Sequence, residues 1–505
     1  MTFDKFNTTA APMPGQLLSF NGTTLTWQNF AGDTWNIAGN SGTSPSVNFL
    51  GTKDNVALEI KVNNARAFRL EPGESSPNLI GGYSGNSVAA GVQGGTISGG
   101  GAVELTNQVS DDFCFIGGGA FNQAGKVDGA TNSAAYATIG GGYANLASDL
   151  ATTIAGGYLN YASSNSATVA GGYNNFANGP YSFVGGGYAN TASGDSAAVS
   201  GGYTNTASGL SAFIGGGDEN VASADYGTVA GGLENLVDVT YGFIGGGYFN
   251  TILDTAGTVG GGQNNASSYY ASVGGGYFNN ATNDFAVVGG GSDNLATSPF
   301  STIGGGGTNV VTGDFATIPG GRLNAAVGNF SFAAGNRAVA NHDGSFVWGD
   351  SNNADIESGA NNQFIARASG GVKFFSNAGA TVGAQLAPNA NAWSVISDRN
   401  VKKNFRPVDN AEILNQLACL PIQRWNYQWE EDSQTPHIGP MAQDFKAAFY
   451  PGRDDKSIST FEFDGVALAA IQGLAQLLQE KESKMAALEK RVAELEEVVK
   501  GLATR

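Results

Sequence analysis

Charged residues, cysteine and histidine are all scarce in this chain of 505 residues. Only 13% of its residues are charged, and 42 acidic against 24 basic residues give a formal net charge of −18. Unspecific binding to nucleic acid or to an anionic membrane requires a basic surface, so the composition argues against both partners. The two cysteines, Cys114 and Cys419, lie far apart and predict neither a disulfide framework nor a zinc site. Because the only histidines are His342 and His437, chemistry that requires several imidazoles is excluded, and we expect no metal and no cofactor.

Long hydrophobic runs are also missing. The N-terminal sequence MTFDKFNTTAAPMPGQLLSF lacks a basic start followed by an apolar run, so it predicts no secretory signal. No stretch approaches the ~20 apolar residues that a membrane-spanning helix needs. We therefore expect a protein that is made in the cytoplasm and does not insert into a membrane. If it works outside the cell, lysis or a particle must carry it there.

Glycine, by contrast, is in excess, and many of the 77 glycines belong to an internal repeat. The pattern [VI]-[GAS]-G-G-x-x-N has a period of 15 residues, with one step of 14 between Val259 and Val273. The β-branched anchors are Ile139, Ile154, Val169, Val184, Val199, Ile214, Val229, Ile244, Val259, Val273, Val288, Ile303 and Ile318. The asparagines are Asn145, Asn160, Asn175, Asn190, Asn205, Asn220, Asn235, Asn250, Asn265, Asn279, Asn294, Asn309 and Asn324.

A repeat of this length is too short for a strand plus a helix, and its glycines rule out a helix interior. It predicts one turn of a β-solenoid, with two short strands and two tight bends. We expect each Val or Ile to point inward and stack on its neighbours in adjacent turns. The glycines would allow a bend or the close approach of another chain. The asparagine is expected in a left-handed bend, with an asparagine ladder along the axis as a further expectation.

One anchor and a few alanines per turn make a thin core, which predicts association with further copies of the chain. Near-identical turns would also let a partner slip by one repeat. The 14-residue step and the eight extra residues between Asn122 and Asn145 oppose such slippage. A separate device that aligns the chains would oppose it further.

The repeat array resembles the head domains of trimeric autotransporter adhesins, which are trimers of left-handed parallel β-rolls. The resemblance covers residues 77–352 and implies a mainly β, trimeric β-roll. The chain departs from that family because it has neither a secretion signal nor a C-terminal membrane-barrel segment. Residues 1–76 are interpreted as a β-rich attachment region, and residues 353–396 as a β connector.

The C-terminal segment, residues 397–505, has a different composition and ends in a heptad pattern over 466–502. Two helices are expected, one around 409–419 and one around 441–449, and Asp409 is expected to cap the first. Nine of the ten a and d positions are apolar, which predicts a coiled coil. The a positions are Ile471, Leu478, Met485, Val492 and Val499, and the d positions are Leu474, Lys481, Leu488, Leu495 and Leu502.

Residues 397–505 resemble the C-terminal intramolecular chaperone of endosialidases, phage tail spikes and tail fibres. The resemblance is carried by Ser397-Asp398 with Lys402-Lys403-Asn404, Leu420-Pro421 to Tyr427, His437-Ile438-Gly439, and Ala442-Gln443-Asp444. It implies an α+β domain that drives trimer assembly and then cuts itself off before the serine of S-D-x-x-x-K. In this chain the scissile bond would be Ile396–Ser397.

The residues at this bond suit such a reaction. A serine hydroxyl needs a base, and a lysine amine can serve once burial or nearby positive charge favours its neutral form. Lys402 follows Ser397 by five residues, a separation that one helical turn or a tight bend spans. We therefore assign Ser397 and Lys402 as a catalytic pair. Asp398 and His437 are assigned as possible supporting residues, with His437 more simply explained as a structural hydrogen-bonding residue.

These observations predict a homotrimeric tail fibre or spike of a phage or phage-like contractile injection particle. It would bind a cell-surface glycan or protein receptor, attach to a tail or baseplate protein at its N-terminal end, and at most cleave itself once. Two alternatives stay open: a spike that degrades polysaccharide and a bacterial surface adhesin. The tyrosines that follow Gly-Gly are interpreted as packing between turns or chains in preference to a sugar-binding stripe.

Overall fold

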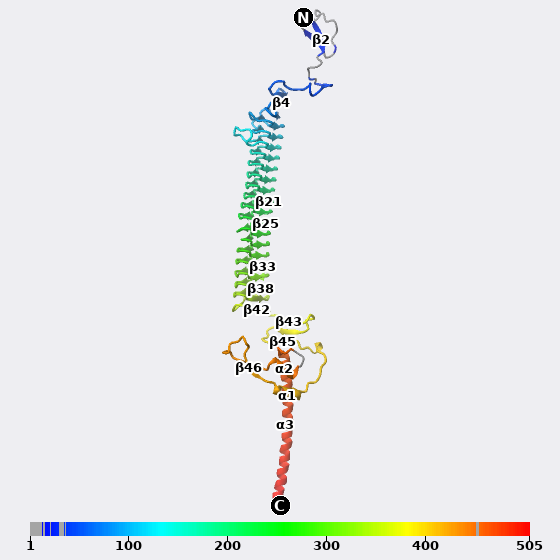
Figure 1. Cartoon of the computed structure of the whole chain (residues 1–505), viewed down its shortest axis with the longest axis vertical. Helices are drawn as coiled ribbons and strands as arrows, with labels where there is room; N and C mark the ends of the chain where they lie inside the picture. Colours follow the sequence, from blue (N-terminus) through cyan, green and yellow to red (C-terminus); the bar gives the residue numbers. More distant parts are fainter. Residues whose placement is uncertain are drawn as a thin grey trace. The chain divides into compact units, whose positions relative to one another are not determined.

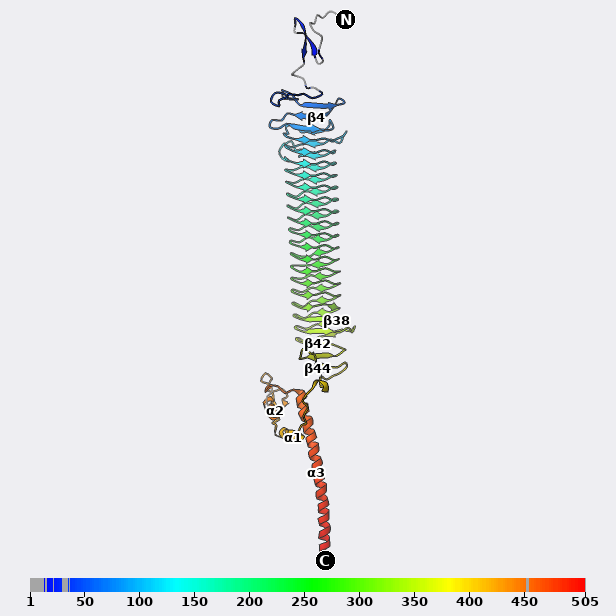
Figure 2. The same cartoon turned by 90° about the vertical axis from the view of Figure 1, so that its right-hand side faces the viewer.

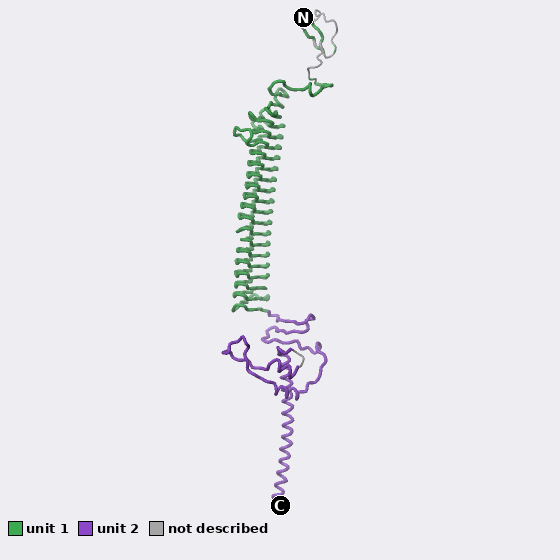
Figure 3. Tube along the Cα trace, in the orientation of Figure 1, with its two compact units in different colours: residues 1–367 green, residues 368–505 purple. Residues whose placement is uncertain are grey.

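The computed structural model describes residues 13, 16–20, 22–29, 35, 37–450 and 454–504. The chain divides into two compact units, Met1–Arg367 and Ala368–Arg505 (Figure 3). The division between them falls inside the predicted connector. The boundaries predicted at residues 76, 352 and 396 stay predictions.

Unit 1 is a β-solenoid of about 19 turns, in which very short strands stack as successive rungs (Figure 2). The first sheet consists of β5 (Asn78–Gly81), β7 (Thr96–Ile97), β9 (Phe115–Ile116), β11 (Thr138–Ile139), β13 (Thr153–Ile154), β15 (Thr168–Val169), β17 (Phe183–Val184), β19 (Ala198–Val199), β21 (Phe213–Ile214), β23 (Thr228–Val229), β25 (Phe243–Ile244), β27 (Thr258–Val259), β29 (Ser272–Val273), β31 (Val287–Val288), β33 (Thr302–Ile303), β35 (Thr317–Ile318), β36 (Gly321–Arg322), β38 (Phe332–Asn336), β40 (Phe346–Gly349) and β42 (Phe364–Arg367).

The second sheet consists of β6 (Ser87–Val88), β8 (Gln108–Val109), β10 (Gln123–Ala124), β12 (Leu146–Ala147), β14 (Tyr161–Ala162), β16 (Phe176–Ala177), β18 (Thr191–Ala192), β20 (Thr206–Ala207), β22 (Val221–Ala222), β24 (Leu236–Val237), β26 (Thr251–Ile252), β28 (Ala266–Ser267), β30 (Asn280–Ala281), β32 (Leu295–Ala296), β34 (Val310–Val311), β37 (Ala325–Ala326), β39 (Ala338–Ala340) and β41 (Ile356–Glu357). In both sheets a repeat strand pairs in parallel with the equivalent strand of the next turn, as Ile139 does with Ile154. A row of single parallel bridges, such as Tyr143 to Tyr158, forms a third ladder.

The core of the solenoid follows the predicted pattern. The β-branched anchors of the first sheet point inward and are fully buried, as Ile139 and Val184 illustrate. The second sheet contributes a small buried residue to the same turn, such as Ala147 or Ala192. The inward stacking predicted for the anchors is thus confirmed, and the core is as thin as the sequence implied.

The repeat asparagines are buried and form a continuous ladder. Asn190 illustrates it: its Nδ2 donates to Asn175 Oδ1 at 3.2 Å and to the carbonyl oxygens of Gly186 at 2.9 Å and Gly202 at 2.8 Å. The left-handed backbone falls instead on the preceding residue, Ala189, with a φ of 53°. The predicted ladder is confirmed and the predicted left-handed asparagine is wrong, because a buried amide that links successive turns requires the bend one residue earlier.

Glycine is required where one turn closely approaches the next. Gly202 has a φ of +99°, and a Cβ atom there would lie 2.2 Å from the carbonyl oxygen of Gly217. The neighbouring Gly201 has open space, since its nearest neighbour to a Cβ would be Gly186 O at 3.9 Å. At Gly202 the close approach is therefore to the next turn of the same chain.

The two irregular steps of the repeat both lie in the bend that leads from the second sheet back to the first. In the short turn, Ser267 occupies the buried core position and its Oγ donates to the carbonyl oxygen of Ala271 at 2.6 Å. The long bend is held by Asp111 of the preceding turn, whose buried carboxylate accepts from the backbone N–H groups of Lys126 at 2.6 Å and Ala134 at 3.1 Å. Both bends change length while the strand register is kept.

Before the solenoid, β1 (Gln16–Phe20) pairs antiparallel with β2 (Leu25–Asn29). The hairpin of β3 (Leu58–Val62) and β4 (Ala65–Glu71) lies within the region predicted to be β-rich, and β4 pairs with β5 to enter the first turn (Figure 1). Other parts of the region predicted as an attachment end, including residues 1–12, lie outside the described residues.

Unit 2 begins with an antiparallel sheet of β43 (Val372–Phe375), β44 (Gly383–Leu386) and β45 (Ser394–Val395). It continues with a 3₁₀ helix η1 (Arg399–Val401), α1 (Asn410–Cys419), the pair β46 (Gln423–Trp425) and β47 (His437–Gly439), α2 (Ala442–Phe449) and α3 (Thr460–Ala503). Both short helices were predicted, and the Asp409 side chain caps α1 as expected. Leu420, Phe445 and Val466 form a small core among α1, α2 and α3.

Helix α3 is long enough and apolar enough to cross a membrane by length and composition alone, with an 18-residue window of mean hydropathy 1.2. This differs from the expectation that no stretch approaches that length. The apolar residues of α3 include Ile471, Leu474 and Leu478, which occupy predicted heptad positions. The predicted coiled-coil seam would require the same composition.

Candidate self-cleavage site

Ser397 and Lys402 lie on either side of the single turn of η1. The Asp398 side chain caps this turn by accepting from the backbone N–H of Asn400 at 2.9 Å. Lys402 follows as the C-terminal cap, and its Nζ donates to Ser397 Oγ at 2.6 Å. One 3₁₀ turn thus spans the five-residue separation, and Asp398 contributes by shaping that turn.

The predicted scissile bond lies where the chain leaves the sheet. Ile396 is half-buried, and its backbone N–H donates to the carbonyl oxygen of Gly383 at 3.2 Å, which holds it beside β44. Ser397 and Lys402 are both exposed in the single chain. The residues described within one chain therefore bring nucleophile and amine together without burying either.

An aromatic ring also contacts the Lys402 amine. Nζ lies 4.9 Å from the ring centroid of Phe461, in the first turn of α3. Arg399, from the same 3₁₀ turn as the site, lies over the Phe405 ring at 5.8 Å. The sequence analysis missed Phe461, because no local pattern connects a residue at the start of a long helix to a lysine 59 positions earlier.

His437 lies elsewhere, in the β46–β47 pair. Its ring stacks on Trp425 with centroids 4.7 Å apart, and its Nε2 is 3.0 Å from Glu430 Oε1. That hydrogen bond holds the pKa of the Glu430 carboxyl below its ordinary value. Among the described residues, the contacts of His437 are with this aromatic group and Glu430, not with Ser397 or Lys402. A supporting role for His437 in cleavage stays a prediction.

The tyrosines that follow Gly-Gly stack along the solenoid. Tyr143, Tyr158, Tyr173, Tyr188 and Tyr203 form one such run, with successive centroids 4.9 to 5.1 Å apart. The rings lie nearly parallel, with interplanar angles between 3° and 14°. Because each ring face inside the run is covered by the next ring, a sugar cannot stack on it. The packing interpretation of the row fits this geometry.

The two cysteines are free and differ in environment. Cys114 is buried in the solenoid core, and burial raises the pKa of its thiol to about 12. A thiol that stays protonated is a poor nucleophile and a poor metal ligand. Cys419 is exposed at the end of α1.

Residues 397–452 match the model of the family described as chaperone of endosialidase. The match begins at Ser397 and covers Lys402, α1, the β46–β47 pair and α2, while α3 follows it. Together with the solenoid of about 19 turns, it fits a tail fibre with a C-terminal chaperone domain. No curated protein matches the chain.

Proposed function

We propose that this chain is the subunit of a homotrimeric tail fibre or spike of a phage or phage-like contractile injection particle. The solenoid would bind a glycan or protein receptor on a cell surface, and the N-terminal end would attach to a tail or baseplate protein. The C-terminal chaperone domain would align three chains and then release itself by cutting Ile396–Ser397. The observation that carries this proposal is a chaperone match that begins at a serine already hydrogen-bonded to a lysine amine.

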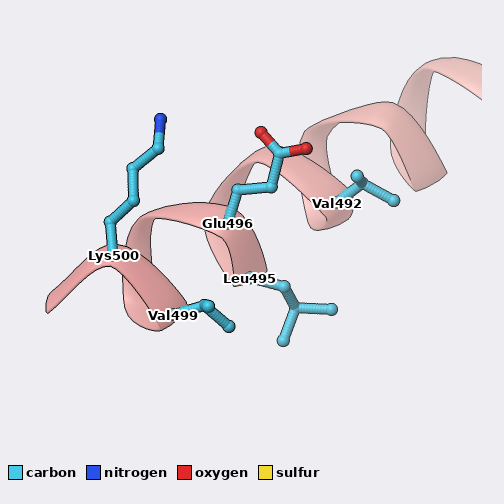
Figure 4. Close-up of a pocket in the computed structure, with 5 residues that line it drawn as sticks. All are labelled: Val492, Leu495, Glu496, Val499 and Lys500. Carbon is cyan, nitrogen blue, oxygen red and sulfur yellow. The ribbon is translucent and has the colours of Figure 1, made fainter. Parts of the chain in front are cut away.

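The exposed apolar stripe of α3 supports assembly. Leu488 and Leu495 are 62% and 58% exposed, and the other apolar a and d residues are also exposed in the single chain. Figure 4 shows Leu495 and Val499 projecting from a different side of the helix from Glu496 and Lys500. A stripe of this kind is buried when helices wrap around one another. We infer three helices, since the trimeric β-rolls that the solenoid resembles would impose their symmetry.

The proposed cleavage balances with the groups at the site. The neutral amine of Lys402 accepts the hydroxyl proton of Ser397, and Oγ attacks the carbonyl carbon of Ile396. The carbon–nitrogen bond breaks as the Ser397 nitrogen takes the proton from Lys402, which leaves an ester between Ile396 and Ser397 Oγ. Water then hydrolyses the ester to the Ile396 carboxylate and the Ser397 hydroxyl. Burial of the exposed pair by neighbouring chains would make cleavage depend on assembly.

The test is denaturing gel migration of the full chain with and without boiling. Wild type is expected to give a product that ends at residue 396 and a fragment of residues 397–505, with a trimer before boiling. Ser397→Ala should remain full length and still trimerise, because the substitution removes only the nucleophile. Identical full-length migration of wild type and variant would exclude self-cleavage, while a monomer before boiling would exclude the trimer.

Turnover also distinguishes the proposal from the polysaccharide-degrading alternative. A fibre that only attaches should bind purified surface polysaccharide without releasing shorter products. Release of oligosaccharides by the purified trimer would favour the degrading spike instead.

A further inference from the structure

One amine makes both contacts that define the candidate site. Lys402 Nζ is 2.6 Å from Ser397 Oγ and 4.9 Å from the centroid of the Phe461 ring. Phe461 belongs to the first turn of α3, the helix that carries the heptads. The ring therefore connects the site to a helix that lies outside the residues matched by the chaperone family.

We propose that Phe461 is a positioning residue for self-cleavage, whose ring holds the Lys402 amine against the Ser397 hydroxyl. This inference rests on the proposed self-cleavage. It adds a residue that acts through Lys402 and that contacts neither the scissile bond nor the nucleophile.

The physical reason lies in the lysine side chain. An exposed lysine has a flexible four-carbon stem, so its amine spends much of its time away from any one acceptor. An aromatic face attracts a cation placed over it. The ring attracts the resting ammonium of Lys402 and the ammonium formed by proton transfer alike, so its contribution to the reaction is to position the amine. The contact thus restricts the amine to the neighbourhood of the Ser397 hydroxyl.

The position of the ring depends on the fold of α3. Val466 and Ala470, one to three turns further along the helix, are buried. Gly473 admits the backbone of α1, since a Cβ there would lie 2.3 Å from the carbonyl oxygen of Asn410. Packing of α3 against α1 therefore sets where its first turn begins, and through Phe461 where the amine rests. The folding of α3 would therefore also place the Lys402 amine for cleavage.

The experiment measures the first-order cleavage rate of the full chain on denaturing gels for three variants. Phe461→Leu keeps an apolar side chain but removes the ring face, and should slow cleavage about three- to tenfold. Phe461→Tyr keeps the face and should cleave within about twofold of wild type. Phe463→Leu is the matched control, because Phe463 packs near Phe445 with centroids 6.0 Å apart, and it should cleave at the wild-type rate.

The outcomes separate this inference from the function on which it rests. If wild type releases no 397–505 fragment, both are overturned. If wild type cleaves and Phe461→Leu cleaves at the same rate, only the role of Phe461 is overturned. Slowing in Phe461→Leu that Phe461→Tyr shares, or that Phe463→Leu reproduces, would assign the effect to packing and also overturn the role. Native migration of each variant confirms that the trimer has formed.

Discussion

The solenoid and the C-terminal unit differ in how far a single chain buries their side chains. In the solenoid each turn buries its anchor and its asparagine against the next turn of the same chain. In the C-terminal unit only a few apolar residues are buried, among them Leu420, Phe445 and Val466, while a long stripe of α3 stays exposed. The comparison shows that the stacked turns bury their anchors within one chain, whereas the apolar stripe of α3 stays exposed in one chain.

The difference also bears on where specificity for assembly resides. The stacked turns are nearly identical, so a second chain could align with them in several registers at similar energy. The C-terminal unit is unlike any other part of the chain, and its stripe presents distinct residues along the length of α3. The unit with the smaller core is therefore better suited to set the alignment of the chains.

The largest effect is expected from a charge in the helical stripe. Leu488→Asp places a carboxylate at a central d position, where burial of an unpaired charge is strongly unfavourable. Sedimentation should show loss of the trimer at concentrations where wild type is fully assembled. Glu489→Gln, one residue further on, lies outside the predicted a and d positions and should assemble normally. Unchanged assembly of Leu488→Asp would show that the stripe is not the contact between chains.

A smaller effect, confined to the solenoid, is expected from Gly202→Ala. Its left-handed φ and the nearby Gly217 carbonyl oxygen leave no room for a Cβ. We expect a loss of roughly 4 kcal/mol in the free energy of unfolding, measured by denaturant titration. Gly201→Ala is the matched control and should change that free energy by less than about 0.5 kcal/mol. Equal stability of the two variants would contradict the account of close approach between turns.

The smallest effect is expected from removing one rung of the asparagine ladder. Asn190→Ala leaves the backbone N–H of Asn205 without its acceptor and removes the amide donor to the carbonyl oxygens of Gly186 and Gly202. The expected cost is about 2–3 kcal/mol in the free energy of unfolding. Asn178→Ala removes an exposed amide whose Oδ1 accepts from Ser163 Oγ at 2.8 Å, and should cost less than about 0.5 kcal/mol. A loss of less than about 0.5 kcal/mol in the free energy of unfolding for Asn190→Ala would show that the ladder contributes little to stability.

Much of the fold was predictable because its determinants repeat. A β-branched residue recurring every 15 positions identifies the inward face of each turn, and the buried anchors confirm it. The left-handed φ at Ala189 was not predictable, because the intrinsic preference for the left-handed region favours Asn190 over Ala189. Only the stacked structure shows that the amide must reach the neighbouring turns.

The candidate site also has one part that the sequence predicted and another that only the structure shows. The sequence by itself predicted that Lys402 can reach Ser397, because the five-residue separation is local, but it left a helical turn and a tight bend as alternatives. The structure has one 3₁₀ turn there, capped by Asp398. Only the tertiary structure decided which ring lies beside the amine and which turn receives each asparagine amide. Contacts between distant segments depend on how whole elements pack, and no periodicity in the chain records that packing.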